Sequence, residues 1–193
     1  MKTAFHLLIV AALLLSACGE ANNNAAKDQP EVSESAKAAA MAHFEQAKEL
    51  MENVNANTTA QTYETAIEAL TAAIKADPTN ELFYLYRSTC NGRLSRPKSA
   101  ISDLNTVVEL DPEFAVAYRN RGGLKYQLQD FEGAEADFTK LIELKPDDGN
   151  AFYNRAAVRG QMGNPNACKD FERAIELALI NEEDILYKRY CTE

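Results

Sequence analysis

The sequence predicts an all-α protein in which helical hairpins repeat and stack into a solenoid. From Ala36 onward the chain is rich in Ala, Leu, Glu and Lys, and it lacks the apolar–polar alternation of half-buried strands. Proline, an aromatic residue, arginine and alanine also recur together at one regular interval along the chain. A single hairpin cannot bury its apolar face alone, so the repeated units are expected to pack on one another.

The N-terminus has the pattern of a signal peptide that is removed from the mature protein. An apolar run from Leu7 to Leu15 is shorter than the roughly 20 residues that a transmembrane helix needs. The next residues, Leu15-Ser16-Ala17-Cys18, resemble a bacterial lipobox. The resemblance implies cleavage of residues 1–17 and attachment of lipid to Cys18, with enough acyl chains for stable anchoring. An ordinary secretory signal with an incidental cysteine is the alternative.

Residues 18–35 predict a flexible, lipidated tether. They are polar, contain three consecutive asparagines and Pro30, and show no apolar period. A tether of this kind has a reach of roughly 20–25 Å. Gly19, and not aspartate, follows the cysteine, which by analogy with enteric bacteria favours the outer membrane. We therefore expect a protein of the bacterial cell envelope that faces the periplasm and meets the membrane through its lipid alone.

The rest of the chain is organised by self-similarity at a period of about 34 residues, which is typical of helical repeat proteins. Each proline of the series follows a helix-ending stretch, because proline cannot continue the backbone hydrogen-bond ladder. The matched positions are Pro78, Pro112 and Pro146; Tyr84, Tyr118 and Phe152; Arg87, Arg121 and Arg155; Ala66, Ala100 and Ala134; and Leu70, Leu104 and Phe138.

Residues 114–146 illustrate one predicted hairpin. Apolar side chains between Phe114 and Leu128 fall on one helical face, and Asp130 is placed to cap the following helix. Small residues such as Gly122 are expected where the two helices approach closely. The buried stripe of the second helix is predicted to contain Ala134, Phe138, Leu141 and Ile142.

The segment AYRNRGGLKYQLQDFEGAEADFTKLIELKP within residues 115–146 closely resembles a tetratricopeptide repeat of the Asn-Arg-Gly subclass. The resemblance implies a right-handed superhelical solenoid with a short C-terminal capping helix. The chain lacks tryptophan and has arginine where the first helix of the broader pattern usually has leucine. The resemblance places a degenerate repeat with a longer loop at 36–78, repeats at 79–112, 113–146 and 147–179, and the cap at 180–193.

The repeated arginines have candidate partners on the second helix of their own hairpins. The interval from arginine to aspartate is the same in the repeats at 79–112 and 113–146, and in the repeat at 147–179 it is shorter by one residue, as is the turn between the two helices. This predicts a structural ladder of bidentate ion pairs, because the planar guanidinium group can meet a carboxylate through two hydrogen bonds. The alternative is that the arginines point into a groove and bind a partner's carboxylate. The pairs are Arg87–Asp103, Arg121–Asp137 and Arg155–Asp170.

Residues 181–191 predict a short terminal helix with Asn181 as its cap and acidic residues in its first turn. An antiparallel turn centred on Ile180 would bring Cys168 and Cys191 side by side, so we predict a disulfide between them. The closed loop would contribute about 3 kcal/mol in the chain-entropy model. Cys90 is expected to be a small core residue rather than a reactive thiol.

Charge and residue spacing argue against several functions. The chain has 20 basic and 29 acidic side chains, a balance that disfavours nucleic acid and broad docking on anionic lipid. His6 leaves with the signal peptide and His43 stands alone, and the cysteines lack metal-site spacing. We therefore expect no catalysis, no metal, no small-molecule substrate and no cofactor apart from the covalent lipid. Proteins of the envelope are therefore the expected partners.

The tetratricopeptide resemblance implies that the first helices of successive repeats line a concave groove for a partner's peptide or helix. The predicted function is a lipid-anchored adaptor for protein–protein interaction. The alternative is a structural subunit of an envelope complex or homo-oligomer without a groove ligand, and the oligomeric state stays open. Several groove tyrosines have packing between repeats as their alternative role. The groove candidates are Leu85, Tyr86, Thr89, Arg119, Asn120, Tyr126, Tyr153 and Asn154.

Overall fold

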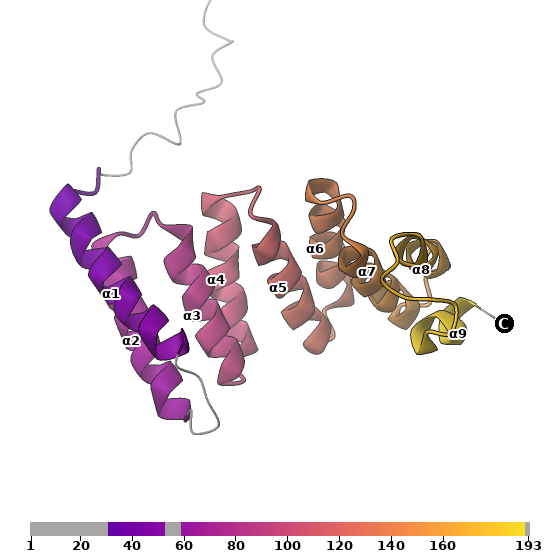
Figure 1. Ribbon diagram of the computed structural model, residues 1–193, viewed down its shortest axis with the longest axis horizontal. Helices are drawn as coiled ribbons and strands as arrows, with labels where there is room; N and C mark the ends of the chain where they lie inside the picture. Colours follow the sequence, from indigo (N-terminus) through magenta and orange to yellow (C-terminus); the bar gives the residue numbers. More distant parts are fainter. Residues whose placement is uncertain (1–30, 53–58, 192–193) are drawn as a thin grey trace, which may run out of the picture. The chain divides into compact units, whose positions relative to one another are not determined.

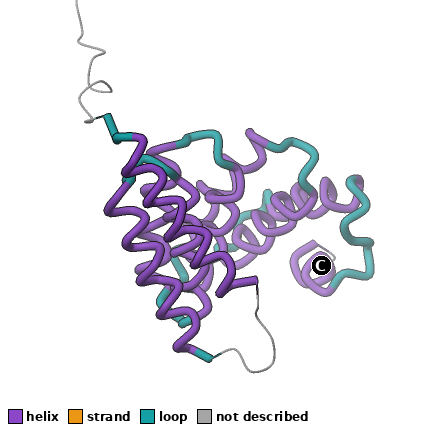
Figure 2. The backbone as a smooth tube through the Cα atoms, turned by 60° about the vertical axis from the view of Figure 1, so that its left-hand side comes forward, coloured by secondary structure: helices purple, strands orange, loops and turns teal. Residues whose placement is uncertain are grey.

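The computed structural model describes residues 31–52 and 59–191, and helix is the regular structure throughout this part of the chain (Figures 1 and 2). All the described helices belong to one compact unit, residues 32–193. The predicted signal peptide, the predicted lipidation site Cys18 and the longer loop expected around residues 53–58 lie outside the described residues.

The described helices form four consecutive hairpins and one terminal helix. Each helix packs against the next one in chain order, as the succession along Figure 1 shows. The predicted all-α architecture of stacked hairpins is confirmed. The hairpins are α1 (Glu34–Glu52) with α2 (Ala60–Ala76), α3 (Glu81–Arg93) with α4 (Pro97–Leu110), α5 (Ala115–Gln127) with α6 (Phe131–Leu144), and α7 (Gly149–Gln161) with α8 (Ala167–Glu176); α9 spans Ile185–Cys191.

The first described helix begins within the segment predicted to be tether, at Glu34. The backbone N–H of Ala36 donates to the Ser33 hydroxyl at 3.2 Å, so Ser33 acts as a cap. This leaves Glu34 in the first turn, where a negative charge is favourable beside the unpaired backbone N–H groups.

The repeated prolines lie at equivalent corners between hairpins. Pro78, Pro112 and Pro146 each come directly after the C-cap residue of a second helix. At the first two corners an aromatic side chain of the next helix also donates a hydrogen bond to the proline carbonyl. The Tyr84 hydroxyl is 3.2 Å from the Pro78 oxygen, and the Tyr118 hydroxyl is 3.1 Å from the Pro112 oxygen. These bonds fix the angle at which the next hairpin starts.

The turns inside three hairpins share a backbone conformation that was not predicted from the sequence. Ser95, Gln129 and Gly163 have φ values of 56°, 62° and 66°, and they recur at the same interval as the corner prolines. This left-handed conformation ends the first helix of each hairpin. Only the third position is glycine, the residue that tolerates positive φ without steric cost.

The core contains an alternation of small and large side chains. An alanine is fully or almost fully buried near the start of each second helix, and a large apolar residue follows on the next turn. In the fourth hairpin the alanine and the large residue each lie one position earlier than the spacing of the other hairpins predicts, because its inter-helix turn is shorter. The alanines are Ala66, Ala100, Ala134 and Ala167, and the large residues are Leu70, Leu104, Phe138 and Phe171.

Cys90 is completely buried in α3, with its sulfur 3.4 Å from the Met51 sulfur. Burial raises the pKa of this thiol to about 11. Only about one thiol in a thousand is then ionised at pH 8, and the thiolate is the reactive form. We expect iodoacetamide at pH 8 to leave Cys90 unmodified in the native chain and to alkylate it in urea, as read by peptide mass mapping. Rapid alkylation of the native chain would contradict this burial.

The terminal helix begins later than expected. Asn181 does not cap it: the Asn181 side chain accepts from the backbone N–H of Glu183 within a turn. Asp184 is the cap, because one of its carboxylate oxygens accepts from the N–H groups of Leu186 at 2.9 Å and Tyr187 at 3.2 Å. The prediction of Asn181 as cap with acidic residues in the first turn is therefore wrong. The acidic residues precede the helix, whose first turn has none.

Candidate binding site

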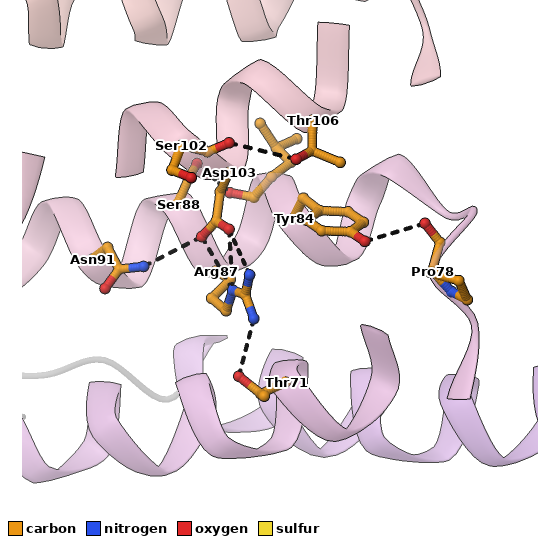
Figure 3. Close-up of polar contacts among 10 residues, drawn as sticks. Thr71, Pro78, Tyr84, Arg87, Ser88, Asn91, Ser102, Asp103 and Thr106 are labelled. Carbon is orange, nitrogen blue, oxygen red and sulfur yellow. Dashed lines mark hydrogen bonds and ion pairs between the residues drawn. The ribbon is translucent and has the colours of Figure 1, made fainter. Parts of the chain in front are cut away.

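The arginine of the second hairpin joins three helices. Arg87 on α3 meets Asp103 on α4 through Nη2 at 2.6 Å and through Nε at 3.1 Å, and its Nη1 donates to the Thr71 hydroxyl on α2 at 3.2 Å (Figure 3). The Asp103 side chain is 6% exposed. Because Thr71 belongs to the preceding hairpin, the contact ties one hairpin to the next as well as closing its own.

The next two arginines repeat this arrangement. Arg121 lies 2.6 Å from Asp137 and Arg155 lies 2.8 Å from Asp170, so the structure joins each pair that the spacing indicated. Their Nη1 atoms donate to Asn105 at 2.9 Å and to Thr139 at 3.2 Å, again on the second helix of the preceding hairpin. These polar partners were not predicted, although Thr71, Asn105 and Thr139 recur at the same interval as the arginines.

Further contacts hold each buried carboxylate. The side chain one helical turn after each arginine also binds the aspartate: Asn91 Nδ2 is 3.3 Å from Asp103, Lys125 Nζ is 2.8 Å from Asp137, and Arg159 Nη1 is 2.7 Å from Asp170. The arginines also lie 5.4–5.8 Å from the ring centres of Tyr84, Tyr118 and Phe152, within cation–π range. The three guanidinium groups are thus engaged within the chain.

A cavity of about 400 Å³ lies between α3 and α5 and is open to solvent. We call it the α3–α5 cavity. Three of the predicted groove residues line it: Thr89 from α3, and Arg119 and Asn120 from α5. The other lining residues were not among the predicted groove residues. They are Ser88, Gly92, Arg93, Leu104, Gly123, Leu124 and Gln127.

The lining of the α3–α5 cavity is cationic. Its residues include two arginines and no carboxylate. The Arg119 guanidinium pairs with Asp148, whose carboxylate also accepts from the backbone N–H groups of Asn150 and Ala151 at the start of α7. This contact fixes the position of Arg119, which keeps 42% of its side chain exposed. Arg93 is exposed in the last turn of α3.

The predicted groove tyrosines pack against other rings. Tyr86 meets Phe44 of the preceding hairpin edge-on, with ring centres 5.0 Å apart. Tyr126 and Tyr153 pack against rings of their own second helices, Phe131 at 5.7 Å and Phe171 at 5.6 Å. Packing between repeats, the alternative left open for several tyrosines, is seen in the ring contact of Tyr86, whereas the ring contacts of Tyr126 and Tyr153 lie within their own hairpins.

The remaining groove candidates lie outside the cavity lining. Leu85 packs beside Leu104 and Val107, and Asn154 is half-buried on α7. The Tyr153 hydroxyl is 3.5 Å from Asp184. Burial, and then the neighbouring Asp184 carboxylate, raise the pKa of Tyr153.

The C-terminal end is closed by α9. Cys168 near the start of α8 and Cys191 at the end of α9 form a disulfide with their Cα atoms 5.4 Å apart. The buried Phe171 ring lies between Tyr187 and Tyr190 of α9 and Tyr153 of α7. The terminal helix therefore covers an apolar surface that a further hairpin would otherwise cover.

Two adjacent glycines of α5 differ in what surrounds them. A Cβ atom at Gly122 would lie 3.1 Å from the Phe138 ring, whereas one at Gly123 would meet nothing within 4 Å. We expect Gly123→Ala to raise the free energy of unfolding by about 1 kcal/mol, the helix-propensity gain. Gly122→Ala should lower it, because the ring must move. Urea denaturation of both variants checks this, and a loss of stability in Gly123→Ala would contradict it.

Residues 31–52 and 59–191 contain no group of three or more His, Cys, Asp or Glu side chains arranged to hold a metal ion. None of the helices in this part of the chain combines the length and apolarity that crossing a membrane requires.

Comparison with known proteins supports the repeat fold. Residues 115–148 match the family model of a tetratricopeptide repeat, and no curated protein matches the sequence. The chain resembles the crystal structure of MamA protein with 22% identity over 72% of this chain and 73% of that one, at a TM-score of 0.66.

Two further solved structures show the same likeness. One is YrrB, described as a TPR protein with an unusual peptide-binding site, with 20% identity over 83% of this chain and 77% of that one, at a TM-score of 0.66. The other is the first TPR of Spaghetti (RPAP3) bound to the HSP90 peptide SRMEEVD, with 25% identity over 65% of this chain and 94% of that one, at a TM-score of 0.59. The tetratricopeptide-repeat fold expected from the sequence is thereby confirmed.

Proposed function

We propose that this chain, a protein of the tetratricopeptide-repeat fold, is an adaptor that binds a segment of a partner protein in the α3–α5 cavity. The observation that carries the proposal is an open cavity of about 400 Å³ lined by side chains of two successive first helices. Two structurally similar proteins, the first TPR of RPAP3 and YrrB, are described as peptide-bound and as having a peptide-binding site. That likeness supports a peptide ligand rather than a reaction.

The ladder of arginines supplies the rigidity that such a site needs. Arg87 and Arg121 connect α2, α3, α4, α5 and α6 through hydrogen bonds to both neighbouring second helices. The cavity walls α3 and α5 are therefore held at a fixed separation before any partner arrives. A preformed site loses less conformational entropy on binding, which favours affinity.

The same proposal includes a lipid anchor at Cys18 and a place in the bacterial cell envelope, on the outer membrane facing the periplasm. The lipobox-like Leu15-Ser16-Ala17-Cys18 supports this part. Mass spectrometry of the mature N-terminal peptide should find acyl chains on Cys18, and Cys18→Ser should release the protein from the membrane fraction. An unmodified Cys18 in the mature chain would refute the anchor.

Site-specific photo-crosslinking tests the binding site. A photoreactive residue in place of Asn120 faces the α3–α5 cavity, whereas one in place of the exposed Lys98 on α4 does not line it. We expect crosslinked partners from position 120 that are lost when Gly123→Leu fills the cavity. Crosslinks from position 98 should be unaffected. Partners captured from position 120 in equal yield despite Gly123→Leu would show that the cavity is not the docking site.

The alternative of a structural subunit or homo-oligomer predicts a different solution mass. A monomer is expected for an adaptor with an open cavity. A stable oligomer in which Arg119 is protected from solvent would favour the alternative. Analytical ultracentrifugation together with hydrogen exchange of α5 distinguishes the two.

A further inference from the structure

The α3–α5 cavity has the opposite charge to the rest of the protein. The whole chain carries 29 acidic and 20 basic side chains, a formal net charge of −9. The cavity lining nevertheless includes Arg93 and Arg119 and no aspartate or glutamate. A protein with this net charge repels acidic segments at long range. A preference for an acidic ligand would therefore have to arise locally, at these two side chains.

The two arginines are presented differently. Arg119 is oriented by its ion pair with Asp148, and a guanidinium group has five N–H donors, so donors remain for a second carboxylate. Arg93 takes part in none of the ion pairs found within residues 31–52 and 59–191, and it is exposed at the end of α3. One arginine is thus fixed in position, and the other can move onto a ligand.

The glycines of the cavity have no packing role inside the chain. A Cβ atom at Gly92 or at Gly123 would meet nothing within 4 Å. Glycine inside a helix costs about 1 kcal/mol relative to alanine, so these two positions weaken α3 and α5 without a gain in packing. They provide backbone without a side chain on the two cavity walls α3 and α5, which allows a ligand's main chain to approach closely.

From these observations we propose that the α3–α5 cavity binds an acidic peptide segment. An aspartate or glutamate of the segment lies between Arg93 and Arg119, and its main chain crosses Gly92 and Gly123. Asn120, Thr89 and Gln127 supply hydrogen-bonding groups to that main chain. This assignment rests on the proposed adaptor function and names the chemistry of its partner.

The test uses three pools of short fluorescent peptides of equal length and the purified full chain. The pools share the same neutral positions and differ at four sites, which carry Asp or Glu, Asn or Gln, or Lys or Arg. We expect the acidic pool to bind at least tenfold more tightly than the amide pool, with affinity falling as salt rises. Fluorescence anisotropy measures the binding.

Variants locate the binding. Arg93→Glu should lower the affinity for the acidic pool at least tenfold. Lys98→Glu makes the same change in net charge outside the cavity and should change this affinity less than twofold. Gly123→Leu should abolish binding of the acidic pool, and urea denaturation establishes that each variant is folded.

The outcomes separate this inference from the adaptor proposal. If amide or basic peptides bound as tightly as acidic ones, and if Gly123→Leu abolished that binding, the acidic preference would be overturned and the adaptor function would still stand. Equal weakening by Lys98→Glu and Arg93→Glu would show a dependence on net charge alone and overturn the site. If Gly123→Leu affected no pool, both proposals would fail.

Discussion

Replacing Arg87 with methionine is expected to lower the free energy of unfolding by about 3 kcal/mol, near the lower end of the roughly 3–5 kcal/mol measured when one member of a buried ion pair is removed. The substitution leaves the Asp103 carboxylate, 6% exposed, with Asn91 as its remaining side-chain partner at 3.3 Å. The stranded charge then lies in a medium that solvates it poorly. We expect a loss near the lower end of this range because Arg87 itself is 22% exposed.

Two control variants isolate this effect. Arg96→Met breaks a surface ion pair with Glu64, in which the two side chains are 47% and 34% exposed, and it should lower the free energy of unfolding far less than Arg87→Met does. The double variant Arg87→Met/Asp103→Leu removes both charges and should recover much of the loss. Urea denaturation followed by circular dichroism gives the free energies of these variants and of the unaltered chain. Equal small losses in Arg87→Met and Arg96→Met would show that the Arg87 pair contributes no more than an exposed one.

The effect of Arg87→Met should also be directional. Arg87 bonds to Thr71 on α2 as well as to Asp103 on α4, so its loss weakens the junction between the first and second hairpins. In a solenoid each unit is stabilised by its nearest neighbours. Hydrogen exchange should therefore increase more in α1 and α2 than in α7 and α8.

The repeat period accounts for most of what could be predicted. Pro112 and its counterparts lie at the hairpin corners because proline ends a helix whatever surrounds it. The Arg121–Asp137 pair followed from a spacing that recurs, because the same geometry must place the same side chains together in each unit. Helix-ending residues and the recurring interval thus specify how the hairpins are arranged along the chain.

Features that depend on the space between units could not be predicted in the same way. Gly122 and Gly123 are adjacent in sequence, yet the Phe138 ring reaches only the first of them. The cavity lies where the side chains of neighbouring helices leave space unfilled, and no sequence pattern predicts where such a space occurs. Similarly, Asn181 and Asp184 are both good capping residues, and only the turn preceding α9 decides between them.

The predicted tyrosine roles show the same limit. Tyr86, Tyr126 and Tyr153 occupy positions on first helices where an exposed ring could contact a ligand. Each packs against a neighbouring ring instead, because burying an aromatic side chain is more favourable than leaving it in water. Polar and small residues are left to line the open surface.

Loss of the Cys168–Cys191 disulfide is expected to release α9 and leave the hairpins folded. The helix spans only Ile185–Cys191, too short to be stable in isolation, and none of its residues is fully buried. Its other attachments include the contacts of Tyr187 and Tyr190 with Phe171 and the 3.5 Å contact between Tyr153 and Asp184. A crosslink that closes a loop of this length contributes about 3 kcal/mol through the entropy of the open state.

Hydrogen exchange with and without reductant measures this release. We expect exchange of residues 185–191 to increase about a hundredfold, since about 1.4 kcal/mol corresponds to a factor of ten. Exchange in α3–α6 should stay unchanged, because each hairpin depends on its own neighbours. The double variant Cys168→Ser/Cys191→Ser should reproduce the exchange pattern and become insensitive to reductant. Unaltered protection of residues 185–191 would show that the aromatic contacts alone hold α9, and loss of protection throughout would show that α9 stabilises the whole solenoid.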